Sequence, residues 1–150
     1  MDKIDRKLLN LVQHNANRTN SDLAEEVGLS PSSCLRRMQR FHKTGVIDRI
    51  VAILNPKKSG RNIKAIVTVN LELHGEQHMQ AFINRMSKEV AVTGVYSVTG
   101  ETDVVLMLRL QDMDEFDVLC QKFAKEETNI ARYVTMMVIR TAKEETAVDI

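Results

Sequence analysis

The first third of the chain repeats apolar positions with the period of α-helices. Apolar residues at positions 4–12 lie three to four apart among charged residues, which predicts a first amphipathic helix. A second short helix is predicted over residues 21–27, because Thr19 or Asn20 can cap its start and Gly28 can end it.

A third helix is predicted from Pro31 to about Lys43, with Ser30 as its N-cap and proline at its first position. One side of this helix is expected to face the core, and it consists of Leu35, Met38 and His42, flanked by Cys34 and Phe41. The opposite side consists of Ser33, Arg36, Arg40 and Lys43, with Arg37 at its edge. Two helices joined by a turn of about three residues predict a helix-turn-helix, whose second helix contacts DNA.

The β-branched residues 46–54 predict a β segment that forms the wing of a winged helix-turn-helix, from which Arg49 can reach a DNA phosphate. Proline, glycine and charge without periodicity follow in residues 55–60, as expected at a domain boundary. We therefore predict a winged helix-turn-helix domain at residues 1–55 and a linker at residues 56–63.

Residues 64–150 carry strand and helix patterns in the order β-α-β-β-α-β. The predicted strands cover residues 65–73, 92–99, 104–110 and 130–140, and the predicted helices contain the apolar positions 79–86 and 116–123. This order is that of a ferredoxin-like domain of the α+β class, in which two helices cover one face of a four-stranded sheet. Because strand 104–110 is apolar on both sides, we expect the open face to pack on a second sheet in a dimer.

Charge separates the two halves of the chain. Residues 1–62 contain twelve Lys or Arg and six Asp or Glu, whereas residues 63–150 contain nine and fourteen, so the halves carry +6 and −5. The basic half fits a polyanionic partner. No apolar run reaches the roughly 20 residues of a membrane span, no export signal is visible, and Cys34 and Cys120 suggest no disulfide framework. These features predict a cytoplasmic protein, associated with the nucleoid and without a membrane partner.

Two carboxylates, Glu101 and Asp103, lie in a polar turn that begins at Gly100 and precedes the apolar strand 104–110. Such a pair could serve as acid and base or bind a cation. No His or Cys pattern with metal-ligand spacing accompanies it, so we predict neither an enzyme nor a metal site. The residues alone favour a plain β-turn, with a ligand site as the alternative.

The combination resembles the Lrp/AsnC family of transcriptional regulators, also called feast/famine regulators. The resemblance lies in residues 5–13, 23–37, 44–47, 54–56 and 98–103. Its most specific parts are the stretch LSPSSCLRR and the turn with glycine and acids. The resemblance implies a winged helix-turn-helix and a ferredoxin-like sensing domain of the RAM type, an α/β sandwich. It also implies homodimers that assemble to octamers, and amino acid effectors bound where dimers meet.

Transferred onto this chain, the family implies two sets of site residues. The DNA-binding set is Arg18, Thr19, Ser32, Ser33, Arg36, Arg37 and Arg40, which Arg49 of the predicted wing joins. The effector-binding set is Val98, Gly100, Glu101, Thr102, Asp103 and Met113. An amino acid effector suits the turn, because its ammonium can meet Asp103 and its carboxylate can meet backbone N–H groups. No other cofactor is expected. One departure is that relatives often carry an aromatic residue at the position of Thr102 or Val104.

Two functions remain open for such a chain. The first is a sequence-specific regulator whose DNA binding or oligomeric state responds to an amino acid. The alternative is an architectural protein of the same fold, which wraps DNA around an oligomer without an effector. Both bind DNA, but only the regulator has an affinity for DNA that a small molecule changes.

Overall fold

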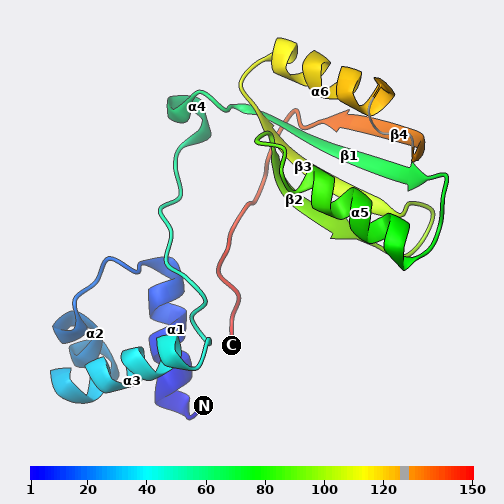
Figure 1. Cartoon of the computed structure of the whole chain (residues 1–150). Helices are drawn as coiled ribbons and strands as arrows, with labels where there is room; N and C mark the ends of the chain where they lie inside the picture. The colour runs from blue at the N-terminus through cyan, green and yellow to red at the C-terminus, as the bar shows by residue number, and fades with distance from the viewer. Residues whose placement is uncertain (126–128) are drawn as a thin grey trace. The chain divides into compact units, whose positions relative to one another are not determined.

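The computed structural model describes residues 1–125 and 129–150, which divide into two compact units (Figure 1). Unit 1 comprises Met1–Ile53 together with Ala142–Ile150, and unit 2 comprises Leu54–Thr141. None of the helices in the described part of the chain has the length and apolar character that crossing a membrane requires.

Unit 1 contains the three predicted helices, which are α1 (Lys3–His14), α2 (Asn20–Val27) and α3 (Pro31–Lys43). Each begins at a side chain that caps it. The hydroxyl of Thr19 accepts from the N–H of Asp22 at the start of α2, and the hydroxyl of Ser30 accepts from the N–H of Ser33 at the start of α3. Gly28 ends α2 with φ 72°, in the left-handed region that favours glycine. The local signals in the sequence therefore place the helix-turn-helix correctly.

The buried side of α3 differs from the predicted one. Cys34 and Phe41 are 0% and 1% exposed and lie at its centre, whereas Leu35 is 42% exposed and His42 is also exposed. Periodicity could not choose between two neighbouring apolar stripes on this helix. The choice depends on how α1 and α2 pack against it, because the buried stripe joins the cluster that contains Leu8.

The wing prediction is wrong for this structure. No strand forms in residues 46–54, all of which are described, and the large apolar side chains of Ile50, Val51, Ile53 and Leu54 are 58–75% exposed. The β-branched composition favours an extended backbone, but a strand also needs a neighbour for its N–H and C=O groups. The sequence of the segment cannot supply that neighbour. In the predicted linker, Pro56–Ser59 forms the single-turn helix α4.

The last residues of the chain contact α1. The side-chain amide of Asn10 donates to the carboxylate of Asp149 at 2.8 Å, and Gln13 exchanges two hydrogen bonds of 2.8 Å with the backbone of Val148. The sequence placed this segment with the back domain, whereas its contacts assign residues 142–150 to unit 1. The predicted boundaries at residues 55 and 63 stay predictions.

Unit 2 has the predicted ferredoxin-like fold. Its elements are β1 (Ile63–Leu71), α5 (Glu76–Met86), β2 (Val92–Ser97), β3 (Val104–Leu110), α6 (Met113–Lys125) and β4 (Ile130–Met137). The strands form one antiparallel sheet in the order β2-β3-β1-β4. The strand prediction is right at both ends for β3. It continues two residues past the last residue of β1 and of β2 and three past that of β4, and it begins two residues after the first residue of β1.

Alternation along the strands divides the sheet into a buried face and an open face. Every second residue of β1 and β3 is buried, against Phe82 of α5 and Phe123 of α6, and both helices cover this one face (Figure 1). Burial of each phenylalanine contributes about 1.5–3 kcal/mol to folding. On the open face, Tyr96, Val134 and Met136 are 55%, 39% and 45% exposed. The predicted sheet-to-sheet dimer would cover these side chains.

Candidate DNA interface and effector turn

The N-terminus of α3 presents a cluster of serine hydroxyls. The hydroxyl of Ser30 donates to the hydroxyl oxygen of Ser33 at 2.9 Å and lies 3.2 Å from the hydroxyl of Ser32. Ser32 is exposed, as is Arg36 one turn further along the same helix. A helix N-terminus combines unpaired N–H groups with a positive dipole end, so this cluster suits a DNA phosphate.

The arginines of α3 are not equivalent. Arg36 is exposed and makes no ion pair with any described residue. The side chain of Arg40 is 51% exposed and makes an ion pair with Asp5, whereas that of Arg37 is only 24% exposed and pairs with two carboxylates. The helical periodicity of the sequence assigned Arg36 and Arg40 to one surface, with Arg37 at its edge.

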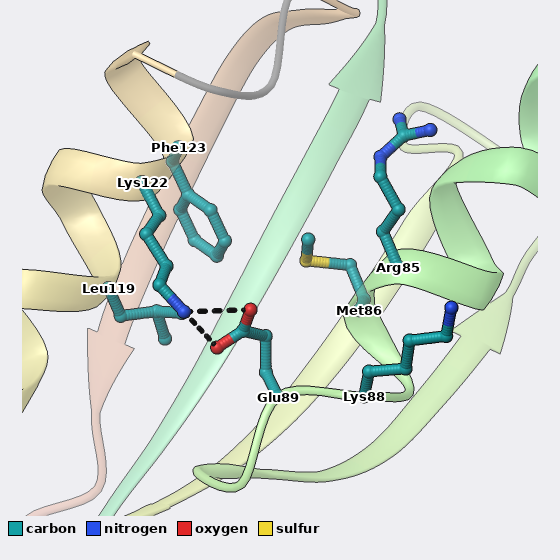
Figure 2. A pocket seen from close by; sticks show the side chains of 7 residues that line it. All are labelled: Arg85, Met86, Lys88, Glu89, Leu119, Lys122 and Phe123. Atoms are coloured by element: carbon teal, nitrogen blue, oxygen red, sulfur yellow. Dashed lines mark hydrogen bonds and ion pairs between the residues drawn. The ribbon is translucent and has the colours of Figure 1, made fainter.

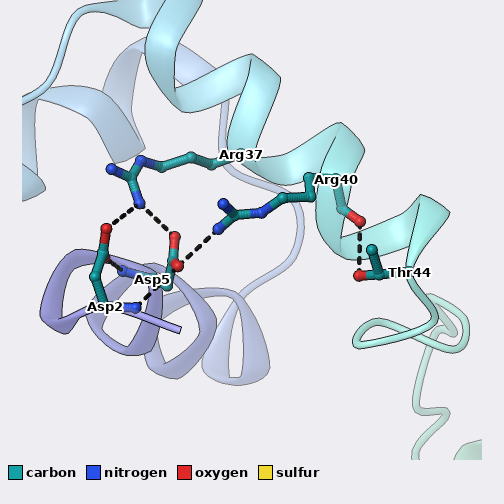
Figure 3. A network of polar contacts seen from close by, with 5 residues as sticks. All are labelled: Asp2, Asp5, Arg37, Arg40 and Thr44. Atoms are coloured by element: carbon teal, nitrogen blue, oxygen red, sulfur yellow. Dashed lines mark hydrogen bonds and ion pairs between the residues drawn. The ribbon is translucent and has the colours of Figure 1, made fainter.

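The carboxylates that engage Arg37 and Arg40 belong to the N-cap of α1, Asp2, and to its first turn, Asp5 (Figure 3). Arg37 Nη1 lies 2.7 Å from Asp2 Oδ2 and 2.5 Å from Asp5 Oδ1, and Arg40 Nη2 lies 2.6 Å from Asp5 Oδ2. Asp2 and Asp5 also form a capping box, in which each carboxylate accepts from the backbone N–H of the other. The network therefore caps α1 and fastens it to α3.

Asp5 is 2% exposed, and its ionisation depends on this network. Burial of the Asp5 carboxyl opposes its ionisation, but hydrogen bonds from the Asp2 N–H and from both arginines outweigh that effect and lower its pKa. At Asp2, the hydrogen bond from the Asp5 N–H, followed by that from Arg37, likewise lowers the pKa. Both carboxyls are therefore held in the charged form that the arginines need.

The other predicted DNA contacts lie in differing surroundings. Arg18 makes an ion pair of 2.5 Å with Glu26, and Thr19 is engaged as the N-cap of α2. Arg49 has a side chain that is 79% exposed and lies 3.8 Å from a carboxylate oxygen of Asp48. Of these three, Arg49 has the side chain most available to a DNA backbone.

In unit 2, the turn between β2 and β3 is fastened to the end of β1. Thr102 Oγ1 donates to the carbonyl oxygen of Val69 at 3.0 Å, and Asp103 Oδ2 accepts from the N–H of Leu71 at 2.8 Å. Pairing of β1 with β3 stops at Val69, so the Asp103 carboxylate satisfies an N–H group beyond the end of the strand ladder. The Val69 carbonyl oxygen accepts from the backbone N–H of Asp103 at 3.1 Å as well as from Thr102. Asp103 therefore has a structural role, but its partner is the N–H of Leu71 in β1 and not a local backbone group of the kind that the plain β-turn prediction supposed.

Two further contacts complete the turn. Asn70 Nδ2 donates to the carbonyl oxygen of Glu101 at 2.6 Å, and the N–H of Val98 donates to the carbonyl oxygen of Asp103 at 3.0 Å. The carboxylate of Glu101 is exposed, and Gly100 has φ 123°. No local pattern pointed to Asn70, because its partner lies 31 residues further along the chain.

The structure does not bring the whole predicted effector set together. Five of the six residues lie in the segment 98–103 before β3, whereas Met113, which is 52% exposed, begins α6 after that strand. The seven residues of β3 span about 20 Å at roughly 3.3 Å per residue. A small effector cannot touch both ends of one strand, so a site that includes Met113 requires the turn of a second copy.

Two hollows lie elsewhere on the described surface. A cavity of about 190 Å³ between α5 and α6 is lined by Arg85, Met86, Lys88, Glu89, Leu119, Lys122 and Phe123 (Figure 2). Lys122 Nζ makes an ion pair with the Glu89 carboxylate across it, at 2.8 and 3.0 Å. A groove of about 420 Å³ along α1 is lined by Lys3, Arg6, Lys7, Asn10, Leu11, His14 and Ile150. Neither hollow contains a residue of the predicted effector set.

Among the described residues, no three His, Cys, Asp or Glu side chains gather as a metal-binding group. Burial raises the pKa of both cysteine thiols, Cys34 and Cys120, which disfavours the reactive thiolate.

A helix-turn-helix with a hydroxyl-rich and basic outward surface, carried on the same chain as a ferredoxin-like unit, defines the class of two-part DNA-binding regulators.

Comparison with known proteins agrees with that class. Residues 1–42 match the family model of the AsnC-type helix-turn-helix domain, and residues 64–148 match that of the Lrp/AsnC ligand binding domain. The chain therefore belongs to the Lrp/AsnC family of transcriptional regulators.

Individual relatives support the same assignment along the whole chain. An uncharacterised HTH-type transcriptional regulator of Sinorhizobium fredii is 37% identical over 150 residues, which cover 100% of this chain and 89% of the relative. The leucine-responsive regulatory protein of Rhizobium meliloti is 32% identical, with 100% of this chain and 96% of the relative covered. A transcriptional regulator of Neisseria meningitidis, solved as a complex with L-Met, has 28% identity and a TM-score of 0.92, covering 99% and 96%.

These findings confirm the predicted family and the overall fold class, with the wing as the exception described above. They also make the chain a DNA-binding transcriptional regulator rather than an enzyme, since the matching families and relatives are regulators of transcription.

Proposed function

We propose that the protein is a sequence-specific transcriptional regulator whose DNA binding or oligomeric state responds to an amino acid. The observation that carries the amino acid response is the likeness of residues 64–148 to a ligand binding domain, together with a structural neighbour bound to L-Met. A relative named as leucine-responsive also supports an amino acid effector. Such a regulator acts in the cytoplasm on the nucleoid.

In this proposal α3 supplies the main contacts to DNA. Ser32 and Ser33 contact a phosphate at the helix N-terminus, while Arg36 and Arg40 reach base edges in the major groove. Arg18, Thr19 and Arg49 contact the backbone. The exposure of Ser32, Arg36 and Arg40 supports this division of roles.

The effector is proposed to bind between two copies of the chain. The carboxylate of Glu101 and the second oxygen of Asp103 face the ligand ammonium, while N–H groups near Gly100 face its carboxylate. The strand length that separates Met113 from this turn supports a site built from the turn of one copy and α6 of another. A homodimer that assembles further, to an octamer, would create such sites.

A thermal-shift screen of the amino acids tests the effector half of the proposal. A ligand at about 100 times its dissociation constant adds ~2.7 kcal/mol to the free energy of unfolding. The same amino acid must then change the affinity for DNA, because linkage is reciprocal. No shift with any amino acid, alongside intact DNA binding, would favour the architectural alternative.

The variant Glu101→Gln sharpens this test. Its side chain makes no hydrogen bond to a described residue, so the change leaves the turn intact while removing one carboxylate. We expect a smaller thermal shift with the responding amino acid than in the wild type. Glu145→Gln, in the segment after unit 2, is the matched control, and an equal shift in both variants would contradict the role of Glu101.

A further inference from the structure

Asp5 occupies an unusual place for a carboxylate in a DNA-binding unit. It is 2% exposed, lies in α1 rather than in the helix-turn-helix, and contacts two arginines of α3 through its two oxygens (Figure 3). The cap of α1 uses only the contact between Asp5 Oδ2 and the N–H of Asp2. The same oxygen also lies 2.6 Å from Arg40 Nη2, so Asp5 links the cap to an arginine of α3.

The two arginines are held differently. Arg37 is 24% exposed and has Asp2 and Asp5 on the same guanidinium nitrogen, so its charge is balanced inside the unit. Arg40 is 51% exposed and has only one nitrogen on Asp5, while its guanidinium carbon lies 5.3 Å from the centre of the Phe41 ring. One edge of the Arg40 guanidinium is therefore held by Asp5, while the rest of the group stays accessible to a ligand.

We propose that Asp5 is a positioning residue for DNA recognition, which holds the Arg40 guanidinium at the outward surface of α3, and that Arg37 is the structural counter-charge of Asp5 rather than a reader of bases. The inference rests on the proposed role of α3 in reading DNA. A planar guanidinium recognises guanine through two parallel hydrogen bonds, so a fixed plane favours the correct base. A side chain that is already ordered also loses less conformational freedom on binding.

Removal of the Asp5 charge should change the affinity for DNA in opposite directions, depending on whether Asp5 acts through its charge or by positioning Arg40. Asp5→Asn adds one positive charge to the net charge near α3, which strengthens attraction to any DNA. Loss of a fixed Arg40 weakens only the binding that depends on base contacts. The ratio of specific to non-specific affinity therefore distinguishes the two effects.

The experiment first uses the wild-type protein to select duplexes of about 25 base pairs from a random pool, a length that holds two half-sites one helical turn apart. The affinities of wild type, Asp5→Asn and Asp2→Asn are then measured for the selected duplex and for a shuffled duplex at one salt concentration. We expect Asp5→Asn to bind the selected duplex about three- to tenfold more weakly and the shuffled duplex equally or more tightly. Asp2→Asn removes the same charge but leaves the contact to Arg40, so its ratio should match that of the wild type.

Several outcomes would overturn the proposal. Equal weakening on both duplexes, with a lower Tm, would make Asp5 a structural residue only, and equal strengthening on both would make it an electrostatic one. If Asp5→Asn does not fold, Arg40→Lys and Arg37→Lys decide, since only Arg40→Lys is expected to lower the ratio. Failure of the wild type to select any sequence would refute the proposed sequence-specific function itself, which is a different result from an unchanged ratio in Asp5→Asn.

Discussion

The outward surface of α3 and the turn of residues 98–103 were both predicted as sites, yet the fold uses their polar groups to different degrees. On α3, Ser32 and Arg36 stay exposed, and only part of the basic set is engaged inside the unit. In the turn, Thr102 and Asp103 both contact the end of β1. A helix satisfies its own backbone except at its two ends, whereas the end of a strand needs neighbours for its backbone groups. Thr102 and Asp103 therefore have a structural role at the end of β1.

The largest effect should come from salt, because it acts on the whole basic surface of unit 1. With six or more phosphate contacts, the affinity for DNA should fall on the order of a thousandfold between 50 and 200 mM salt. Fluorescence anisotropy with a labelled duplex measures this slope. An affinity for DNA that does not change with salt would show that the basic residues of α3 do not contact phosphates. The outward surface of α3 would then no longer differ from the turn in being available to a ligand.

The next effect separates two neighbouring arginines. Arg37→Ala removes an ion pair from the buried Asp5 and should lower the free energy of unfolding by about 1–3 kcal/mol. Arg36→Ala should change it by less than about 0.5 kcal/mol and weaken specific DNA binding by about 1–3 kcal/mol instead. Urea titration of both variants gives the free energy of unfolding, and DNA titration gives the free energy of specific binding. Equal stability losses would contradict the division of α3 into engaged and available arginines.

Asp103 and Glu101 of the turn form a comparable pair of one engaged and one available side chain, with a somewhat smaller expected effect on stability. Asp103→Ala leaves the N–H of Leu71 without its acceptor and should cost about 1–2 kcal/mol of unfolding free energy. Glu101→Ala should stay within about 0.5 kcal/mol, because its carboxylate is exposed. If neither variant changed the free energy of unfolding, the contact of the turn with β1 would not contribute to stability. The polar side chains of the turn would then be as available to a ligand as those on the outward surface of α3.

Acid should weaken unit 1 through its carboxyl network. Because the folded-state pKa values of Asp2 and Asp5 lie below their usual range, their stabilisation is complete above about pH 4. It is lost as the pH falls through the lowered folded-state values. The urea midpoint of the wild type should therefore fall more between pH 5 and pH 2 than that of Asp5→Asn. If the urea midpoints of the wild type and Asp5→Asn fell equally with pH, Asp5 would not be the carboxyl responsible for the loss of stability in acid.

The sequence predicts what depends on local patterns. The helix of residues 31–43 begins at Ser30 and Pro31 and ends where it was expected, because caps and proline act within one turn. The strand Val104–Leu110 was likewise placed by its apolar run. Together with the other helices and strands that local patterns predict, they define both units of the fold.

The parts that sequence reasoning missed all depend on distant partners. The ion pairs of Asp5 join residues 32 and 35 positions apart, and the cap of β1 by Asp103 joins residues 32 positions apart. The segment 46–54 has the composition of a strand, but composition does not provide a pairing partner. A contact that determines whether a side chain is available to a ligand leaves no local trace when its partner is far away in sequence.

The backbone at Gly100 has a consequence for how substitutions at this position should rank. A Cβ added there would meet nothing within 4 Å, yet φ is 123°, which side chains of L-amino acids rarely adopt. The requirement for glycine is therefore torsional and not steric. In a survey of all substitutions at position 100, alanine should be nearly as unfavourable as valine or leucine, whereas a steric requirement would order the variants by size.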